Sequence, residues 1–370
     1  MTQALLFPGR VGLQQRVLPT YRAAFFDRLA EACTGGLSVF TGKPRPSESI
    51  LTVDRLETAQ YVAGRNVHLL GGSAYLCLQP RLLRWLEEWD PGALILEANP
   101  RYLSSGKAAE WMRRRGRPIV GWGLGAGPLS GPFSAFRTAA RRRFLSRFEA
   151  VIAYSSVGAA QYRALGMPAE RVFVAPNAVS APPGPLPERP PVQGRPARLL
   201  FVGRLQARKR VDLLLQACAA CGDRPEVWIV GDGPARVELE RLARVTYPSA
   251  QFRGALRGTQ LDDLFNQADL FVLSGTGGLA VQEAMAHGLP VIVAEGDGTQ
   301  NDLVRAENGW LIPSDNLEAL TQALHHALQA PDRLRSMGAA SHRIVAEEVN
   351  IDAMVRTFIK VLLSVRSGEA

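Results

Sequence analysis

Short apolar runs alternate with amphipathic stretches along most of the chain. Residues 93–96 and 270–273 are apolar throughout and have the length of a buried strand. Between such runs, apolar residues recur at helical spacing, as in residues 82–89. Strands that alternate with helices favour parallel sheets whose two faces are covered. The hydrophobic pattern therefore predicts an α/β fold.

The first half of the chain carries one such alternation. A turn containing Gly9 and Gly12 is expected after the first strand, and residues 44–75 read as irregular, with short strands near Val53 and at 68–70. The expected strands are residues 4–7, 37–41, 93–96, 118–122, 150–154 and 172–175, and the expected helices are residues 21–33, 82–89, 107–115 and 156–164.

A proline-rich run then interrupts the pattern. Residues 180–196 read SAPPGPLPERPPVQGRP, which cannot sustain a helix or a sheet and is typical of a semi-rigid spacer. We therefore expect a first domain at 1–179, this linker, a second domain at 197–345, and a C-terminal helix at 346–370 that packs back on the first domain. The second alternation predicts strands at 198–202, 226–230, around Phe252, 270–273, 291–293 and 308–312, and helices from 211, around 239–242, and at 261–267, 279–288 and 317–330.

The charge of the chain is concentrated in its first half. The formal net charge is +9, and residues 1–179 hold 23 Lys and Arg against 12 Asp and Glu, whereas the remainder holds 20 against 22. Such a surface attracts phosphates, whether of nucleic acid, of lipid headgroups or of a phosphorylated acceptor. Aromatic residues make up only 7% and no RNA-binding signature is legible, so we expect no nucleic-acid partner.

Residues 135–148 are the most basic segment and leave two interpretations open. On a helix, Phe136, Ala140, Phe144 and Phe148 recur every four residues, with arginines around them. The segment could be an amphipathic helix on an anionic membrane surface, with Phe144 and Phe148 in the headgroup region. It could equally be a surface helix whose phenylalanines face the core.

Cysteine usage and hydropathy indicate a cytoplasmic protein. Of the four cysteines, Cys218 and Cys221 fall in an expected helix without a second pair, which favours two small buried residues over a metal or redox site. No apolar run reaches the roughly 18 residues of a membrane span. The first residues lack the features of a signal peptide. We expect a cytoplasmic protein that is peripheral on the inner face of the membrane.

Residues 273–291, LSGTGGLAVQEAMAHGLPV, combine a strand end, a glycine-rich turn, a helix and a second strand. The free amides at the start of such a helix bind phosphate well. Glu283, one turn into the helix, could accept hydrogen bonds from ribose hydroxyls. The alternative is an ordinary α/β connection whose glycines allow close packing.

Five motifs of the second half occur in a fixed order. They are Gly203-Arg204-Leu205 with Lys209 five residues after the arginine, Gly231-Asp232-Gly233-Pro234, the strand Leu270-Phe271-Val272-Leu273, Glu283-Ala284-Met285-Ala286 followed by Gly288-Leu289-Pro290-Val291, and Asn308-Gly309. In this order and spacing the chain resembles the family-4 glycosyltransferases of the GT-B fold, and Pro176-Asn177 is similar to a closing turn of their first domain.

The resemblance implies two Rossmann-like domains facing a cleft and a retaining glycosyltransferase that needs neither metal nor cofactor. The donor would be a nucleotide sugar, UDP- or GDP-linked, and the acceptor a glycan or lipid-linked glycan in cell-surface polysaccharide synthesis. Arg204 and Lys209 would stabilise the leaving diphosphate. Donor binding would fall to Gly203, Gly231, Gly233, Thr276, Gly277, Gly278, Leu279 and Glu283, and we place Gly12, Tyr21 and Arg22 on the acceptor or phosphate side.

The chain departs from the family pattern at several positions. Gly275 stands where the family usually has a first glutamate, eight residues before Glu283, and Arg210 replaces a frequent glycine. His68 is the one histidine of the first half and suggests no catalytic base, which a retaining enzyme does not need if the leaving phosphate takes the acceptor proton. His287 is expected to be a packing or surface residue. A GT-B nucleotide-sugar epimerase and a non-catalytic nucleotide-sugar or anion binder remain as alternatives.

Overall fold

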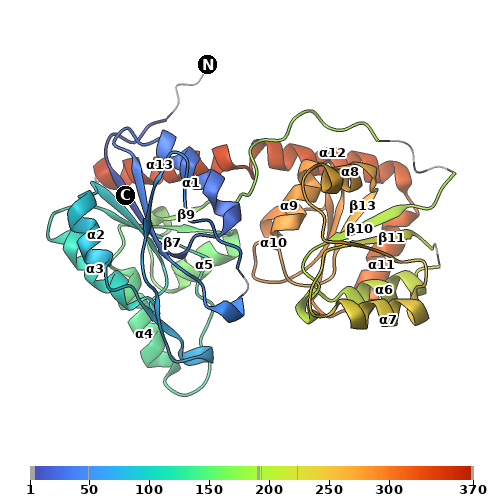
Figure 1. Ribbon diagram of the computed structural model, residues 1–370, viewed down its shortest axis with the longest axis horizontal. Helices are drawn as coiled ribbons and strands as arrows, with labels where there is room; N and C mark the ends of the chain where they lie inside the picture. The colour runs from blue at the N-terminus through green and yellow to red at the C-terminus, as the bar shows by residue number, and fades with distance from the viewer. Residues whose placement is uncertain (1–4, 49, 190–191, 193, 223, 368–370) are drawn as a thin grey trace. The chain divides into compact units, whose positions relative to one another are not determined.

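Two parallel sheets, each with helices on its faces, organise the chain (Figure 1). The computed structural model describes residues 5–48, 50–189, 192, 194–222 and 224–367. The chain divides into one unit of residues 1–179 with 351–370 and a second unit of residues 180–350. Both sheets follow the open, doubly wound α/β plan, which confirms the predicted fold class.

The first unit is built on a seven-stranded sheet in the order β3-β2-β1-β6-β7-β8-β9, and every neighbouring pair is parallel. A short antiparallel hairpin, β4–β5, lies outside it. The strands are β1 Val11–Val17, β2 Leu37–Gly42, β3 Gln60–Ala63, β4 Val67–Leu69, β5 Leu76–Leu78, β6 Ala93–Glu97, β7 Ile119–Gly123, β8 Ala150–Ala153 and β9 Val172–Val174. The helices are α1 Ala23–Glu31, α2 Leu82–Trp89, α3 Leu103–Arg113, α4 Ser134–Leu145, α5 Ser156–Ala164 and α13 Ile351–Ser367.

Two strands of this unit differ from the sequence prediction. The first strand is β1 at Val11–Val17, not residues 4–7, and Gly12 lies inside it rather than in a turn. Of the predicted strand, residues 1–4 lie outside the described residues, and Phe7 makes only an isolated bridge to Cys33. Strand β3 falls in the segment read as irregular, because its half-exposed edge position does not require a continuous apolar run.

The last helix belongs to the first unit. Helix α13 packs on α1 and on the sheet, and Figure 1 shows it (red) beside the blue N-terminal elements. It begins at Ile351 rather than at residue 346, because α12 continues to Glu347. The side chain of Asn350 donates to the carbonyls of Val345 and Ala346, 2.8 and 2.9 Å away, and so satisfies the end of α12.

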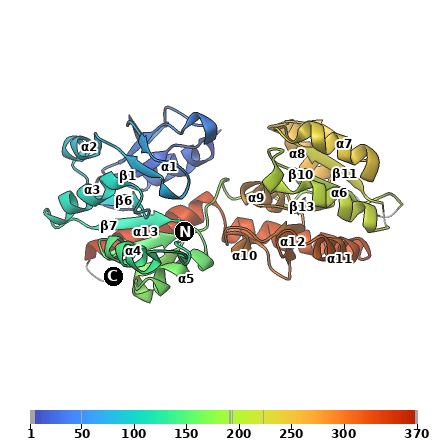
Figure 2. The same cartoon turned by 90° about the horizontal axis from the view of Figure 1, so that it is seen from below.

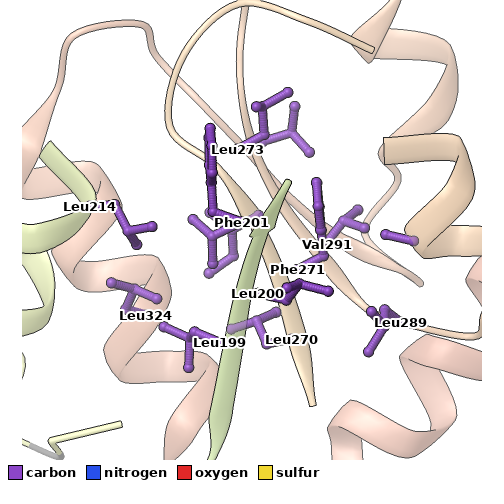
Figure 3. Packing of buried hydrophobic residues seen from close by; sticks show 14 of the residues in the cluster. Leu199, Leu200, Phe201, Leu214, Leu270, Phe271, Leu273, Leu289, Val291 and Leu324 are labelled. Atoms are coloured by element: carbon purple, nitrogen blue, oxygen red, sulfur yellow. The ribbon is translucent and has the colours of Figure 1, made fainter. Parts of the chain in front are cut away.

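The second unit is built on a six-stranded parallel sheet in the order β12-β11-β10-β13-β14-β15. Part of its core lies between the sheet and helices α6 and α11, with Leu199 and Phe201 of β10 near Leu214 and Leu324 (Figure 3). The strands are β10 Arg198–Val202, β11 Glu226–Val230, β12 Gln251–Gly254, β13 Leu270–Leu273, β14 Val291–Ala294 and β15 Gly309–Ile312. The helices are α6 Val211–Ala220, α7 Arg236–Thr246, α8 Thr259–Gln267, α9 Leu279–Ala286, α10 Gln300–Leu303, α11 Leu317–Leu328 and α12 Pro331–Glu347; Figure 2 shows the same arrangement from below.

The proline-rich segment is tied to the second unit by two arginines. Arg189 donates to the carbonyl of Asn266 at 2.9 Å and to those of Ala268 and His287. Arg195 pairs with the buried carboxylate of Asp269 at 2.7 Å. Burial would raise the pKa of Asp269, but hydrogen bonds from Arg195, from the Arg198 amide and from Arg335 hold that pKa below its usual value. The segment is therefore held along this unit rather than forming a free spacer.

The structure around helix α4 shows which phenylalanines of residues 135–148 face the core. Phe144 and Phe148 are buried, 8% and 3% exposed, and pack edge to face at 5.2 Å. They cannot enter a headgroup region, so that expectation was wrong. Phe136, by contrast, is 75% exposed, as is its neighbour Phe133 at 80%. The helix thus buries its C-terminal phenylalanines and presents two others near its start.

The cysteines are buried, as expected for Cys218 and Cys221, and all four are free thiols. Among the described helices, none is both long and apolar enough to cross a bilayer.

Candidate active site

The predicted donor-binding glycines lie on loops that follow neighbouring strands of the second sheet. The loop after β10 runs beside the loop after β11: the Leu205 amide donates to the carbonyl of Asp232 at 2.9 Å. A Cβ at Gly231 would collide with the Gly203 carbonyl, and one at Gly233 with that of Leu205. Both glycines also have positive φ, +139° and +159°. Only glycine allows these two loops to approach so closely.

Lys209 joins the loop after β10 to the glycine-rich turn after β13. A Cβ on Gly277 would come within 2.3 Å of its Nζ, and one on Gly203 within 3.7 Å of its Cε. Desolvation, with a smaller contribution from the Arg208 charge, lowers the pKa of Lys209 from 10.5 to about 8. No carboxylate pairs with it among the described residues. The structure thus places a half-buried ammonium group, without a counter-ion, beside the start of α9.

Arg204 directly follows Gly203, and its side chain is exposed. It lies on the same loop as Lys209. The neighbouring Arg208, which the sequence did not single out, donates to Thr276 Oγ1 at 3.1 Å, and the Thr276 amide donates to the Arg208 carbonyl at 3.0 Å. These bonds fix the glycine-rich turn against the loop that carries both predicted basic residues.

Helix α9 begins at Leu279. Its N-cap residue is Gly278, so no N-cap side chain accepts a hydrogen bond from the first amides of the helix. The first amides of a helix have no partner within it, so the amides around Leu279 can bind an anion. Gln300, which the sequence analysis missed, is fully buried and donates from Nε2 to the Gly277 carbonyl at 2.7 Å. Its only sequence signal is its place directly after the turn that follows β14.

Glu283 lies one turn into α9 and is exposed as a residue, although neighbouring atoms partly desolvate its carboxylate. Desolvation by neighbouring atoms and the Asp262 carboxylate of α8 raise its pKa. His287 stacks on Phe265 at 5.0 Å, and its Nδ1 lies 2.8 Å from Asn266 Oδ1. His287 is therefore a packing residue, as predicted.

Gly275, the departure from the family pattern, has no room for a side chain. A Cβ there would collide with the Arg208 carbonyl and lie 2.5 Å from the Lys209 carbonyl carbon. The residue is buried against the loop after β10, and Ser274 beside it donates to the Arg210 carbonyl at 2.7 Å. The missing glutamate is thus replaced by direct contact between two backbone segments.

Arg210, the second departure, adopts the left-handed conformation with φ +51°, which explains why glycine suits this position. The arginine tolerates it while ion-paired to Asp212 at 3.0 Å and to Asp315.

The three residues expected on the acceptor side lie in the first unit, but one was misplaced. Gly12 is buried within β1, where a Cβ would touch Trp85 at 3.0 Å and Leu94 at 3.1 Å, so it cannot line a loop. Tyr21 lies in the short helical turn Thr20–Arg22. Arg22 is buried, stacks on Trp122 at 4.4 Å and donates to the Tyr154 hydroxyl at 2.9 Å. His68 lies in β4 and bonds Tyr75, 2.8 Å away.

Two family models match successive parts of the chain. "Glycosyl transferase 4-like domain" matches residues 23–178, and "Glycosyl transferases group 1" matches residues 196–330. The chain belongs to the family-4 glycosyltransferases of the GT-B fold. All five motifs of the second half lie within the residues that the second of these models matches.

Relatives of known activity match this glycosyltransferase over part of its length. A GDP-mannose-dependent alpha-mannosyltransferase of Mycolicibacterium smegmatis is 38% identical over 156 residues, 41% of this chain and 39% of the relative. The sulfoquinovosyl transferase SQD2 of Arabidopsis thaliana is 35% identical over 128 residues, 33% of this chain and 23% of the relative. The matched region thus spans well under half of these relatives.

Solved structures share the fold over nearly the whole chain. Anabaena Alr3699/HepE in complex with UDP superposes with a TM-score of 0.70 at 16% identity, over 96% of this chain and 99% of that one. The lipopolysaccharide outer core galactosyltransferase WaaB superposes with a TM-score of 0.69 at 16% identity, over 96% and 99%. At these identities the likeness establishes the fold alone.

Proposed function

We propose that this glycosyltransferase moves a sugar from a nucleotide-sugar donor, bound by its second unit, to a glycan or lipid-linked glycan acceptor. The observation that carries the proposal is the Lys209 ammonium, which lies beside Gly277 at the start of α9. A cation without a counter-ion, next to free helix amides and glycines that leave room, fits a diphosphate.

The residues of this loop cluster would act on the leaving group. Negative charge grows on the nucleotide diphosphate as the glycosidic bond breaks. Arg204, Lys209 and the amides near Leu279 would stabilise that charge more in the transition state than in the ground state. Glu283 would accept hydrogen bonds from the ribose hydroxyls.

We propose that the configuration at the anomeric carbon is retained. No side chain can stand at position 275, so the family's first glutamate has no substitute there. The leaving phosphate would take the proton of the acceptor hydroxyl, and the transfer then needs no separate base. Comparing the anomeric configuration of donor and product by NMR tests this directly.

A UDP or a GDP donor is proposed. A mycobacterial relative is GDP-mannose-dependent by name, and a structural neighbour was solved with UDP. The test incubates the full chain with UDP-, GDP- and dTDP-sugars and follows release of the nucleotide diphosphate. Slow hydrolysis of one donor, together with competition by its nucleotide, is the expected result. A chain that binds none of these nucleotides is not a nucleotide-sugar enzyme, and epimer formation without hydrolysis would favour an epimerase.

We also propose that the protein works at the cytoplasmic face of a membrane, in cell-surface polysaccharide synthesis. The support is α4, which has the exposed Phe133 and Phe136 at its start and the exposed arginines Arg142 and Arg143 in its last turn. Each basic residue near an anionic leaflet contributes on the order of 1 kcal/mol, and salt screens it.

Vesicle co-sedimentation tests the membrane proposal. Binding to anionic vesicles should exceed binding to neutral ones, fall with salt, and fall further in Arg142→Glu with Arg143→Glu. Arg84→Glu, an equally exposed arginine on α2, is the control. Equal and negligible binding to both kinds of vesicle would leave the arginines as an ordinary solvated surface.

A further inference from the structure

A pocket of about 650 Å³ opens in the first unit at the carboxyl ends of β6, β7 and β8. Glu97, Trp122 and Tyr154 line it from these three strand ends. The start of α4 lines it from another side, through Phe136 and Arg137 among others. Its volume suits a small oligosaccharide, and carboxyl ends of parallel strands are where such sheets bind ligands.

Three arginines line this pocket without a partner of opposite charge. Arg101, Arg137 and Arg141 form no ion pair in the described part of the chain, although Arg141 donates to the Gly127 carbonyl at 2.7 Å. Burial, and then the charges of Arg137 and Arg101, lower the pKa of Arg141. The three cations are therefore close enough to repel one another, which is unfavourable unless an anion is bound among them.

Glu97 does not neutralise them. It is the one acidic residue among those that line the pocket, and its carboxylate accepts a hydrogen bond from the Arg16 amide at 2.6 Å. Burial raises the pKa of Glu97, while the positive charge of Arg22 opposes that rise. Since Glu97 is a single carboxylate against Arg101, Arg137 and Arg141, the lining of the pocket keeps an excess of positive charge.

The floor of the pocket has groups that suit a sugar. Tyr154 lines the pocket with an aromatic ring, a surface that packs on the apolar face of a pyranose, whereas the ring of Trp122 is 1% exposed and carries the Arg22 guanidinium at 4.4 Å. The indole N–H of Trp122 is buried and has no acceptor in the described structure. Glu97 and the Tyr154 hydroxyl can exchange hydrogen bonds with sugar hydroxyls.

We propose that this pocket binds an acceptor saccharide that carries an anionic group, a phosphate or a carboxylate, with Arg101, Arg137 and Arg141 on the anion and Glu97 and Tyr154 on the hydroxyls. The inference rests on the proposed function, because it names the class of acceptor for that transfer. The anionic group can belong to the sugar itself or to a lipid diphosphate that carries the sugar.

Binding of defined probes to the full chain tests the proposal. The probes are glucose, glucose 6-phosphate, glucuronic acid, a short-chain prenyl diphosphate sugar and inorganic phosphate. Excess UDP or GDP is present to occupy the diphosphate site of the second unit, and binding is followed by ligand NMR. We expect one or more of the anionic saccharides to bind at least about tenfold more tightly than glucose. The probe that binds best distinguishes a sugar phosphate, a sugar acid and a lipid diphosphate.

Matched variants assign that preference to the pocket. Arg137→Gln with Arg141→Gln should remove the preference for the anionic probe, whereas Arg113→Gln with Arg114→Gln, two exposed arginines on α3, should preserve it. Glu97→Gln should weaken binding of the charged and neutral sugars alike. Because Glu97 is buried, thermal unfolding checks that the Glu97→Gln variant is folded.

Four outcomes overturn the proposal. Two concern the probes: glucose binds as tightly as the anionic sugars, or inorganic phosphate binds as tightly as the anionic sugars. Two concern the variants: both double variants lose the same affinity for the anionic probe, or Arg137→Gln with Arg141→Gln loses none. Nucleotide binding separates the two hypotheses. If the chain binds nucleotide and hydrolyses a donor but fails these tests, only the acceptor class is wrong; if it binds no nucleotide, the proposed function itself fails.

Discussion

Lys209 shows how one side chain can be placed for charge stabilisation. Its ammonium is half-buried between two glycine-containing loops. The loss of solvation destabilises its charged form, and a bound diphosphate would offset this destabilisation. Arg204, on the same loop, is exposed. The two residues differ in surroundings, yet both are expected to act on the same developing charge.

Replacing either residue should slow turnover far more than it affects folding. Removing one contact to the developing charge typically costs about 2.7–4 kcal/mol in the transition state, so Arg204→Ala and Lys209→Ala should each lower kcat by roughly 10²–10³. Thermal unfolding should change little, since neither side chain has a carboxylate partner among the residues that the structure describes. Arg241→Ala, an exposed arginine on α7, is the control. Near-native kcat in either variant would contradict the diphosphate assignment.

The lowered pKa of Lys209 predicts a pH dependence of nucleotide binding. Because this pKa is about 8, the free protein loses the positive charge as pH rises through 8, well before an ordinary lysine would. UDP or GDP affinity should therefore be highest below pH 8 and fall above it, whereas the stability of the unliganded unit should gain over the same range up to about 10.5. Calorimetric titration between pH 7 and 9.5 measures the affinity. Lys209→Arg stays charged and should remove the decline; a decline that persists in this variant must come from another group.

Glu283→Gln should weaken nucleotide binding rather than catalysis of bound donor. The side-chain amide of glutamine lacks the charged oxygen that would accept a hydrogen bond from a ribose hydroxyl. A hydrogen bond to a charged group contributes about 1.5–3 kcal/mol. A 2′,3′-dideoxynucleotide supplies the matched comparison: it should bind wild type less well than the parent nucleotide, and the variant should discriminate little between the two. Equal affinity of variant and wild type for the parent nucleotide would remove Glu283 from the ribose site.

At the scale of elements, α13 brings the end of the chain back to the first unit, whose other elements come from residues 1–179. Phe358 of α13 is fully buried and packs edge to face on Phe25 at 5.0 Å and on Trp122 at 5.1 Å. Trp122 also carries Arg22 on its ring and lines the pocket of the first unit. The last helix therefore supports residues that shape this pocket.

Phe358→Ala should destabilise the first unit by about 3–5 kcal/mol, because it leaves a cavity among aromatic rings. Hydrogen exchange followed by mass spectrometry should accelerate in β1, β6 and β7 and stay unchanged in β10, β11 and β13. Arg356→Ala, exposed on the same helix, is the control and should behave as wild type. Faster exchange in both units would show that they unfold together.

At the scale of the whole molecule, we expect activity without a divalent metal. The Lys209 ammonium and Arg204 would supply the positive charge that a metal ion provides in other transferases. Donor hydrolysis should therefore be unaffected by EDTA, with a known metal-dependent transferase treated in parallel as the control. Loss of activity in chelator, restored by Mg²⁺ or Mn²⁺, would contradict this expectation.

Local pattern alone was sufficient for most of the second unit. Strands β10, β11 and β13 have the predicted bounds, since each is an apolar run buried on both faces of a parallel sheet. The loops after β10, β11 and β13 also lie where the sequence placed their glycines, because these motifs stand within a few residues of strand ends. In these stretches the sequence signal is short-range and strong.

Only the tertiary structure decided the rest, because the deciding contacts join residues far apart in the chain. Gly12 reads as a turn residue, but Trp85 and Leu94 require it within a strand. Phe136 and Phe144 share a helical period, yet only Phe144 meets the core. The three pocket arginines come from two segments that no local pattern connects. The amino-acid sequence thus determined the α/β fold and the glycine-rich loops of the second unit, whose signals are local, whereas the position of β1, the exposed face of α4 and the charge of the first unit's pocket depend on packing between distant elements.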